Sequence, residues 1–151
     1  MDPHDLEIRN ATYRRFVELG RAPLVSEIAA TLGRTDADIA SSWSRLHDAH
    51  AIVLDGGGEI AMANPFAATP TPFRVLADGR SWFANCGWDA FGVGAALHVD
   101  STVETTCADC DEPIHIDVVG GRPVHAGDDE SEPVWHVLVP AAEWWTDIGF
   151  T

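Results

Sequence analysis

The sequence has no long apolar segment. No run of residues reaches the length, about 18, at which a helix can span a membrane. Residues 1–10, MDPHDLEIRN, have neither the basic start nor the apolar core of a secretory signal. We therefore expect a protein that makes no membrane contact and works in the cytoplasm.

Basic residues are also scarce. The sequence has nine Lys and Arg residues and 24 Asp and Glu residues, which gives a net charge of −15. A surface of this kind repels phosphate backbones and lacks the basic footprint of most nucleic-acid binders. The charge argues against nucleic acid as a partner and is compatible with cations.

Cysteine is scarce as well. Three cysteines in 151 residues do not suit a disulfide framework in a cytoplasmic chain, so thiol chemistry or metal binding is the better default. What the chain does have is 46% hydrophobic residues, with six Trp and six Phe. This composition indicates one packed domain of ordinary size, or two small units that share a core.

The first part of the chain has the pattern of three helices and a hairpin. Apolar spacing predicts a helix over residues 4–19, and two more follow, one opened by Ser26 and one begun by Thr35. Two short strands then flank Gly56–Gly58. This order is typical of a winged-helix unit, for which we expect bounds of 1–66. Recognition of DNA by its third helix is disfavoured by the acidic residues there.

The second part of the chain has mostly strand patterns. Residues 64–73, NPFAATPTPF, read as an extended linker. Beyond it, residues 67–151 predict a short helix near 90–99, a hairpin whose tip is CADC, a strand in VWHVLVP and a final element from Ala141. The fold class expected is therefore α+β: a helical unit followed by a small, mostly antiparallel sheet.

Cys86 and Asp89 are the first candidate site. In NCGWDAF, residues 85–91, they stand three positions apart, so in a first helical turn both side chains lie on one face. A helix N-terminus also favours thiolate. The pair would then combine a soft nucleophile or metal ligand with a proton carrier. The alternative is that Cys86 is a small buried residue and Asp89 a helix cap.

Cys107 and Cys110 are the second candidate site. Two thiols at this spacing on a turn can face one soft metal ion, although one CxxC supplies half of a tetrahedral zinc site. The other half could come from Cys86, His98, His115 or a partner chain. A redox pair and a purely structural role remain open.

Residues 82–114, WFANCGWDAFGVGAALHVDSTVETTCADCDEPI, resemble the central segment of the organomercurial (alkylmercury) lyases. In that family an aromatic-rich strand precedes Cys-x-x-Asp, an apolar stretch and a strand that ends in another cysteine. The helical N-terminal unit and the tryptophan-rich C-terminal segment follow the family in order. The resemblance implies the alkylmercury lyase fold for the second unit.

The resemblance also implies an activity. The family cleaves carbon–mercury bonds by protonolysis: thiolates take the mercury and an aspartate delivers the proton. These roles fall on Cys86 and Asp89, and Cys107 matches a cysteine regarded as structural. No cofactor is implied beyond mercury(II), which derives from the substrate, or another soft metal. The implied partners are the organomercurial and small thiols or a dithiol carrier protein.

One departure from the family concerns a second catalytic cysteine. It lies just after the segment that matches residues 141–151, so we expect a truncated or shortened relative. Cys110 is outside the family pattern. Two alternatives follow: a catalytically impaired protein that binds a soft metal through Cys86, Cys107 and Cys110, and a metal-responsive winged-helix regulator.

Overall fold

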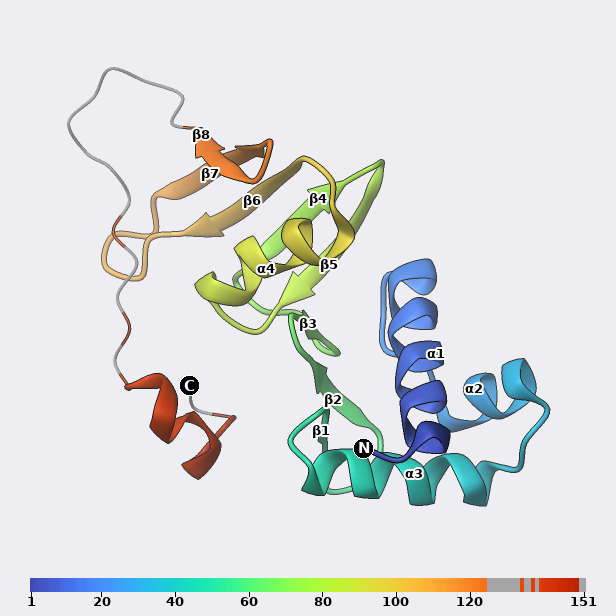
Figure 1. Ribbon diagram of the computed structural model, residues 1–151. Coiled ribbons are helices and arrows are strands. Elements are labelled where there is room, and N and C mark those ends of the chain that lie inside the picture. The colour runs from blue at the N-terminus through green and yellow to red at the C-terminus, as the bar shows by residue number, and fades with distance from the viewer. Residues whose placement is uncertain (125–133, 135–136, 138, 150–151) are drawn as a thin grey trace.

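The computed structural model describes residues 1–124, 134, 137 and 139–149. The molecule is an α+β protein in which a helical N-terminal part leads into one long sheet (Figure 1). Its buried hydrophobic residues form a single cluster that runs from the helices into the sheet. Within the described residues, no helix has the length and apolar character that a membrane crossing needs.

Local capping signals set the bounds of the three N-terminal helices. Helix α1 spans Pro3–Leu19 and ends at Gly20, whose left-handed φ of 67° allows the C-cap. Helix α3 spans Asp36–Asp48, and its Thr35 side chain accepts from the Asp38 N–H, as predicted.

The predicted opening of the second helix at Ser26 is wrong by one residue. Helix α2 spans Val25–Leu32 and its N-cap is Leu24, which has no side-chain oxygen to offer. The Glu27 carboxylate instead accepts the Leu24 N–H at 2.8 Å and fixes the start of the helix.

Eight strands form one sheet in the order β1-β2-β3-β5-β4-β6-β7-β8, with every neighbouring pair antiparallel. The strands are β1 Val53–Leu54, β2 Ile60–Ala63, β3 Phe66–Ala67, β4 Arg74–Ala77, β5 Arg80–Ala84, β6 Ser101–Thr106, β7 Pro113–Val119 and β8 Arg122–Val124.

The sheet passes through the segment that the sequence presented as a linker. Strand β3 lies inside residues 64–73, pairs with β2 on one side and β5 on the other, and buries Phe66. The Phe66 ring stacks on Phe16 of α1 at 5.3 Å and meets Trp82 of β5 edge-on at 6.2 Å. The linker interpretation was therefore wrong for these residues, because nonlocal pairing makes them part of the core.

Helix α4, Gly87–Leu97, packs on β4, β5 and β6 (Figure 1). Its two interior glycines allow close approach, since an added Cβ would meet Pro65 at Gly92 and Ser101 at Gly94. The helix and the β6–β7 hairpin were both predicted from the sequence.

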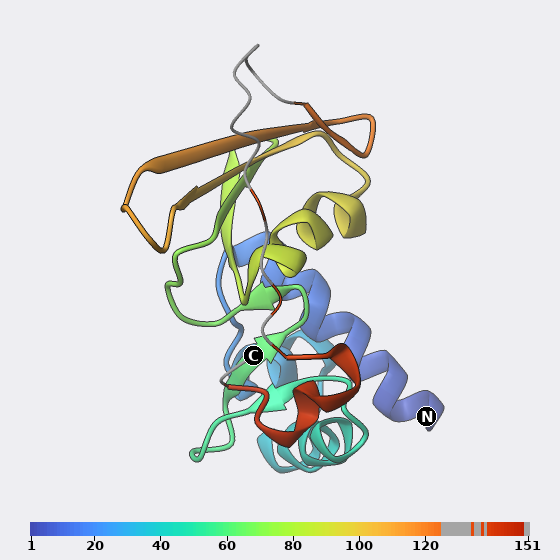
Figure 2. The ribbon, with the colours of Figure 1, turned by 90° about the vertical axis from the view of Figure 1, so that its left-hand side faces the viewer.

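The C-terminal segment returns to the helical part of the molecule. A 3₁₀ helix, η1 Ala141–Thr146, lies beside α3 and β1 in both views (Figures 1 and 2). The Trp145 ring stacks on His50, two residues after the end of α3, with centroids 3.9 Å apart. The strand predicted in VWHVLVP falls mainly outside the described residues.

Candidate functional site

Cys86 lies where β5 ends and α4 begins. It is the N-cap residue of α4, with extended backbone at φ −152° and ψ −179°, and its side chain is half-buried. The thiol therefore faces the N-terminal end of a helix without being enclosed. The position at a helix N-terminus is as predicted, but the thiolate predicted with it is not favoured, because burial raises the pKa of the thiol.

Asp89 occupies the first turn of the same helix, as the spacing predicted. The Asn85 Nδ2 group donates to Asp89 Oδ2 at 2.9 Å and to Asn64 Oδ1 at 3.1 Å. Asn85 thus fixes the acid beside the thiol and ties both to the turn before β3. Its own Oδ1 is buried and accepts no hydrogen bond within the described part of the chain.

Burial sets the protonation of both groups. It raises the pKa of the Cys86 thiol, and the negative charge of Asp89 adds to the effect, while the backbone N–H groups of Trp88 and Asp89 oppose it. Burial also raises the pKa of Asp89, against the hydrogen bond from Asn85. The pair therefore favours a neutral thiol next to a carboxyl group that holds a proton more readily than an exposed aspartate does.

Tyr13 of α1 links the helical part of the molecule to this site. Its hydroxyl donates to the Asn64 carbonyl at 3.1 Å and to the Ala51 carbonyl at 3.3 Å. Burial raises the pKa of Tyr13, and Asp89 contributes in the same direction while Arg9, 4.6 Å from the ring centroid, opposes it. The sequence patterns did not single out Tyr13, Asn64 or Asn85.

Cys107 and Cys110 lie on the tip of the β6–β7 hairpin, Cys107 half-buried and Cys110 exposed. The Cys107 N–H donates to the Glu112 carbonyl at 2.8 Å, and the Asp111 N–H donates to the Cys107 carbonyl at 3.0 Å. These two bonds close the turn and bring the cysteines to one side of it. Both thiols are free.

The structure places Cys86 and this hairpin tip at the same end of the sheet. Phe83 of β5 and Glu104 of β6 both pair with Arg74 of β4, so they lie level with each other. Cys86 is three residues beyond Phe83, and Cys107 three beyond Glu104. At the level of Arg74, strand β4 lies between β5 and β6, so these two strands are about 10 Å apart there. Across the described residues, no group of three Cys, His, Asp or Glu side chains can hold one ion.

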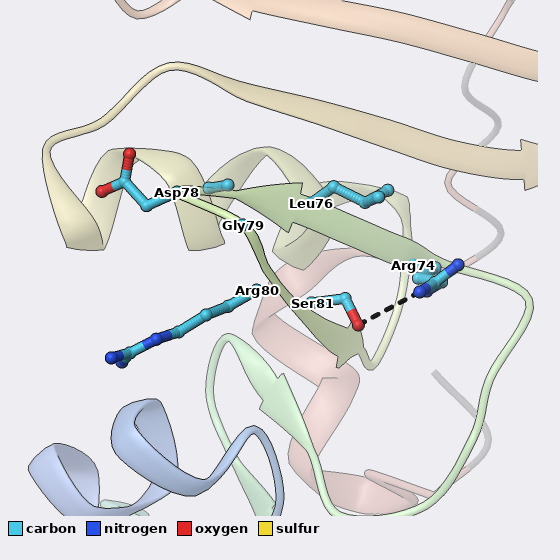
Figure 3. Close-up of a pocket in the computed structure, with 7 residues that line it drawn as sticks. Arg74, Leu76, Asp78, Gly79, Arg80 and Ser81 are labelled. Carbon is cyan, nitrogen blue, oxygen red and sulfur yellow. Dashed lines mark hydrogen bonds between the residues drawn. The ribbon is translucent and has the colours of Figure 1, made fainter.

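A surface pocket lies elsewhere on the sheet, at the β4–β5 hairpin. Its lining comes from β4, β5 and their turn, and includes Arg74, Asp78 and Arg80 but neither Cys86 nor Asp89 (Figure 3). Arg74 spans the floor by donating to Ser81 Oγ at 3.3 Å and pairing with Glu104 at 3.4 Å. The thiol–acid pair therefore lies at a helix terminus outside this pocket.

The protein therefore combines an α+β fold with a cysteine and an acid at one helix N-terminus. Comparisons with known proteins show which proteins it resembles. The alkylmercury lyase family model matches residues 66–151, which is more than half of the chain. The chain belongs to the alkylmercury lyase family.

A solved structure, described as the crystal structure of the mercury-bound form of MerB2, has a similar fold. It matches with a TM-score of 0.65 at 22% sequence identity, covering 83% of this chain and 60% of that one. The chain thus spans 60% of the length of that protein. No curated protein sequence matches the chain.

Proposed function

We propose that the protein cleaves carbon–mercury bonds by protonolysis, with Cys86 as the mercury ligand and Asp89 as the proton carrier. The observation that carries the proposal is the shared first turn of α4, where a half-buried thiol and an acid held by Asn85 stand on one face. Family membership and the mercury bound by a protein of similar fold support the choice of substrate.

The first step is capture of the mercury. The raised pKa of Cys86 keeps the thiol protonated near neutral pH, so its proton must leave as sulfur bonds to mercury. Asp89 accepts that proton, and the thiolate that carried the organomercurial departs. Sulfur is preferred to oxygen by this soft metal, so Cys86 and not Asp89 holds it.

The second step is cleavage. Thiolate donation loads electron density onto the metal-bound carbon, and Asp89 returns its proton to that carbon. The electron pair of the carbon–mercury bond stays with carbon, which leaves as a hydrocarbon, and mercury(II) remains on Cys86. A small thiol from solution completes its coordination. The raised pKa of Asp89 suits this role, because an acid works best when its pKa approaches the working pH.

The helical unit has a positioning role in the same proposal. In this proposal residues 1–66 act as the N-terminal unit, and its Tyr13 and Asn64 reach Asn85 and Asp89 through hydrogen bonds and charge. We infer that this unit orients the acid and does not read DNA. The winged-helix interpretation stays a prediction.

The test is hydrocarbon release. The protein is incubated with phenylmercury and excess small thiol, and benzene is measured by gas chromatography. Cys86→Ser should abolish benzene release, because the thiol that takes the organomercurial is gone. Asp89→Asn should keep mercury retention and lower the rate by about 100-fold or more, since a positioned proton carrier contributes about 100- to 10,000-fold.

Two matched variants control the experiment. Asp78→Asn replaces an exposed acid in the β4–β5 turn, and Cys110→Ser replaces an exposed thiol; both should release benzene at the wild-type rate in a single turnover. No benzene from wild-type protein with reduced Cys86 would sink the enzymatic proposal.

Such a failure would favour a second function, retention of a soft metal without catalysis. The observation behind it is the raised thiol pKa at Cys86, which slows any reaction that needs free thiolate. Mercury held at Cys86 by a chain that releases no hydrocarbon would support it.

A further inference from the structure

The β6–β7 hairpin tip carries two thiols that the proposed reaction does not use. Cys107 directly follows β6 and Cys110 lies three residues further on, exposed to solvent, and the two side chains contact each other. The turn between them is closed by the backbone bonds to Glu112 and Asp111. Two free thiols are therefore held together on a rigid scaffold at the surface.

The backbone of this turn is arranged for an anionic sulfur. The N–H groups of Asp109 and Cys110 point at the Cys107 sulfur and lower its pKa, and the Cys110 side chain adds to the effect. The charge of Asp109 opposes them but does not reverse the result. Cys107 thus differs from Cys86, whose thiol pKa is raised.

The surroundings of the pair limit the kind of ion it suits. No third Cys, His, Asp or Glu side chain joins the two sulfurs in a cluster within the described part of the protein. A tetrahedral zinc site needs four ligands, so the pair alone does not complete one. A soft ion that two thiolates satisfy, such as mercury(II) or copper(I), matches both the number and the type of ligand.

We propose that Cys107 and Cys110 form a second, solvent-facing dithiolate site that binds mercury(II) independently of Cys86. Binding replaces the thiol protons, which pass to solvent, and involves no change of oxidation state. The negative net charge of the protein, −15, favours a cation at such a surface.

Placement gives the site a use. The hairpin tip and the N-terminus of α4 lie at the same end of the sheet, on strands separated only by β4. Mercury left on Cys86 after cleavage would pass by thiol exchange to the dithiol, where two sulfurs hold it better than one. This use rests on the proposed function, whereas binding by the pair does not.

The experiment separates the two sites by working in a Cys86→Ser background. Reduced protein is mixed with mercury(II) chloride and a large excess of a monothiol competitor, desalted, and analysed for mercury by mass spectrometry. The Cys86→Ser chain should keep a mercury ion. Adding Cys110→Ser should weaken retention about 100-fold or more, because chelation by two linked groups is lost.

Cys110 is the informative position because its side chain is exposed, so its replacement leaves the fold intact, which far-UV circular dichroism checks. Cys86→Ser with Asp78→Asn is the matched control and should keep its mercury. Equal retention by the Cys86→Ser chain with and without Cys110 would overturn the proposal, as would no retention in either. Benzene release by Cys110→Ser reports on the proposed function separately.

Discussion

Asn85 is the residue that holds the candidate acid in place. Its amide donates to Asp89 and to Asn64, and so joins the first turn of α4 to the turn before β3. The hydrogen bond to Asp89 lowers that residue's pKa and partly offsets the effect of burial. Asn85 therefore controls both the orientation and the protonation of the carboxyl group.

We expect Asn85→Ala to lower kcat/KM for phenylmercury by about 10–100-fold, as for loss of a group that orients a reacting side chain. The pKa of Asp89 rises further, so the rise of kcat/KM with pH, which follows ionisation of Asp89, moves to higher pH. A pH–rate profile measures this shift. Mercury retention by Cys86 should be unchanged, and an unshifted profile would contradict the positioning role.

At this scale the sequence predicted the thiol and the acid but not their supports. Cys86 and Asp89 are three residues apart, so a single helical turn brings them together and local spacing suffices. Asn64 is 21 residues from Asn85, and their contact depends on how β3 pairs in the sheet. No local pattern encodes that approach.

Helices α1 and α3 are joined by an ion pair between the buried Asp5 and the exposed Arg45. The Asp5 carboxylate accepts from Arg45 at 2.6 Å and from Ser42 at 2.7 Å, and the residue is 6% exposed. Hydrogen bonds from Arg45 are the main reason that the pKa of Asp5 falls to about 2. The pair fixes the two helices against each other.

We expect Asp5→Asn to lower the free energy of unfolding at pH 7 by about 2 kcal/mol, the value of a charged hydrogen bond. Because the pKa of Asp5 is depressed on folding, this stabilisation is present above its unfolded value, about 4, and is lost as the pH falls toward 2. Urea denaturation at pH 7 and at pH 2.5 measures both.

A matched control is Glu18→Gln, which removes the exposed pair with Arg15. It should change the free energy of unfolding by less than about 1 kcal/mol at either pH. Equal losses of unfolding free energy from the two substitutions would show that the burial of Asp5 does not strengthen its ion pair.

Elements with local signals were predicted well, and elements stabilised from a distance were not. Thr35 caps α3 and Gly20 ends α1 because each signal acts within a turn. Strand β3 was missed because its two residues are strand only through partners in β2 and β5. Helix α4 contains Gly92 and Gly94 because Pro65 and Ser101 lie close to it and would be crowded by a Cβ at these positions.

At the scale of the whole molecule, an aromatic stack joins the C-terminal segment to the helical unit. Trp145 of η1 stacks on His50 at an interplanar angle of 6°, so the C-terminal segment rests on the helical unit (Figure 2). The segment and the unit are far apart in the sequence, and neither pattern predicted the contact.

We expect Trp145→Ala to speed amide hydrogen exchange in residues 141–146 by up to about tenfold, which corresponds to loss of an aromatic pair. Exchange in α3 should stay unchanged. Trp144→Ala is the matched control, since Trp144 donates to the Val139 carbonyl within the segment itself. Equal exchange in wild type and Trp145→Ala would show that the stack does not anchor the segment.

The two-residue strand β3 has a consequence for any attempt to divide the protein. The stretch that carries the family signature starts at Phe66, inside a sheet whose next strand, β2, belongs to the preceding residues. A fragment that begins at Phe66 would lack β2, so it would expose the unpaired backbone donors and acceptors of β3 and the Phe66 ring. Such an edge recruits strands from other molecules. The signature-bearing piece is thus expected to self-associate when produced alone.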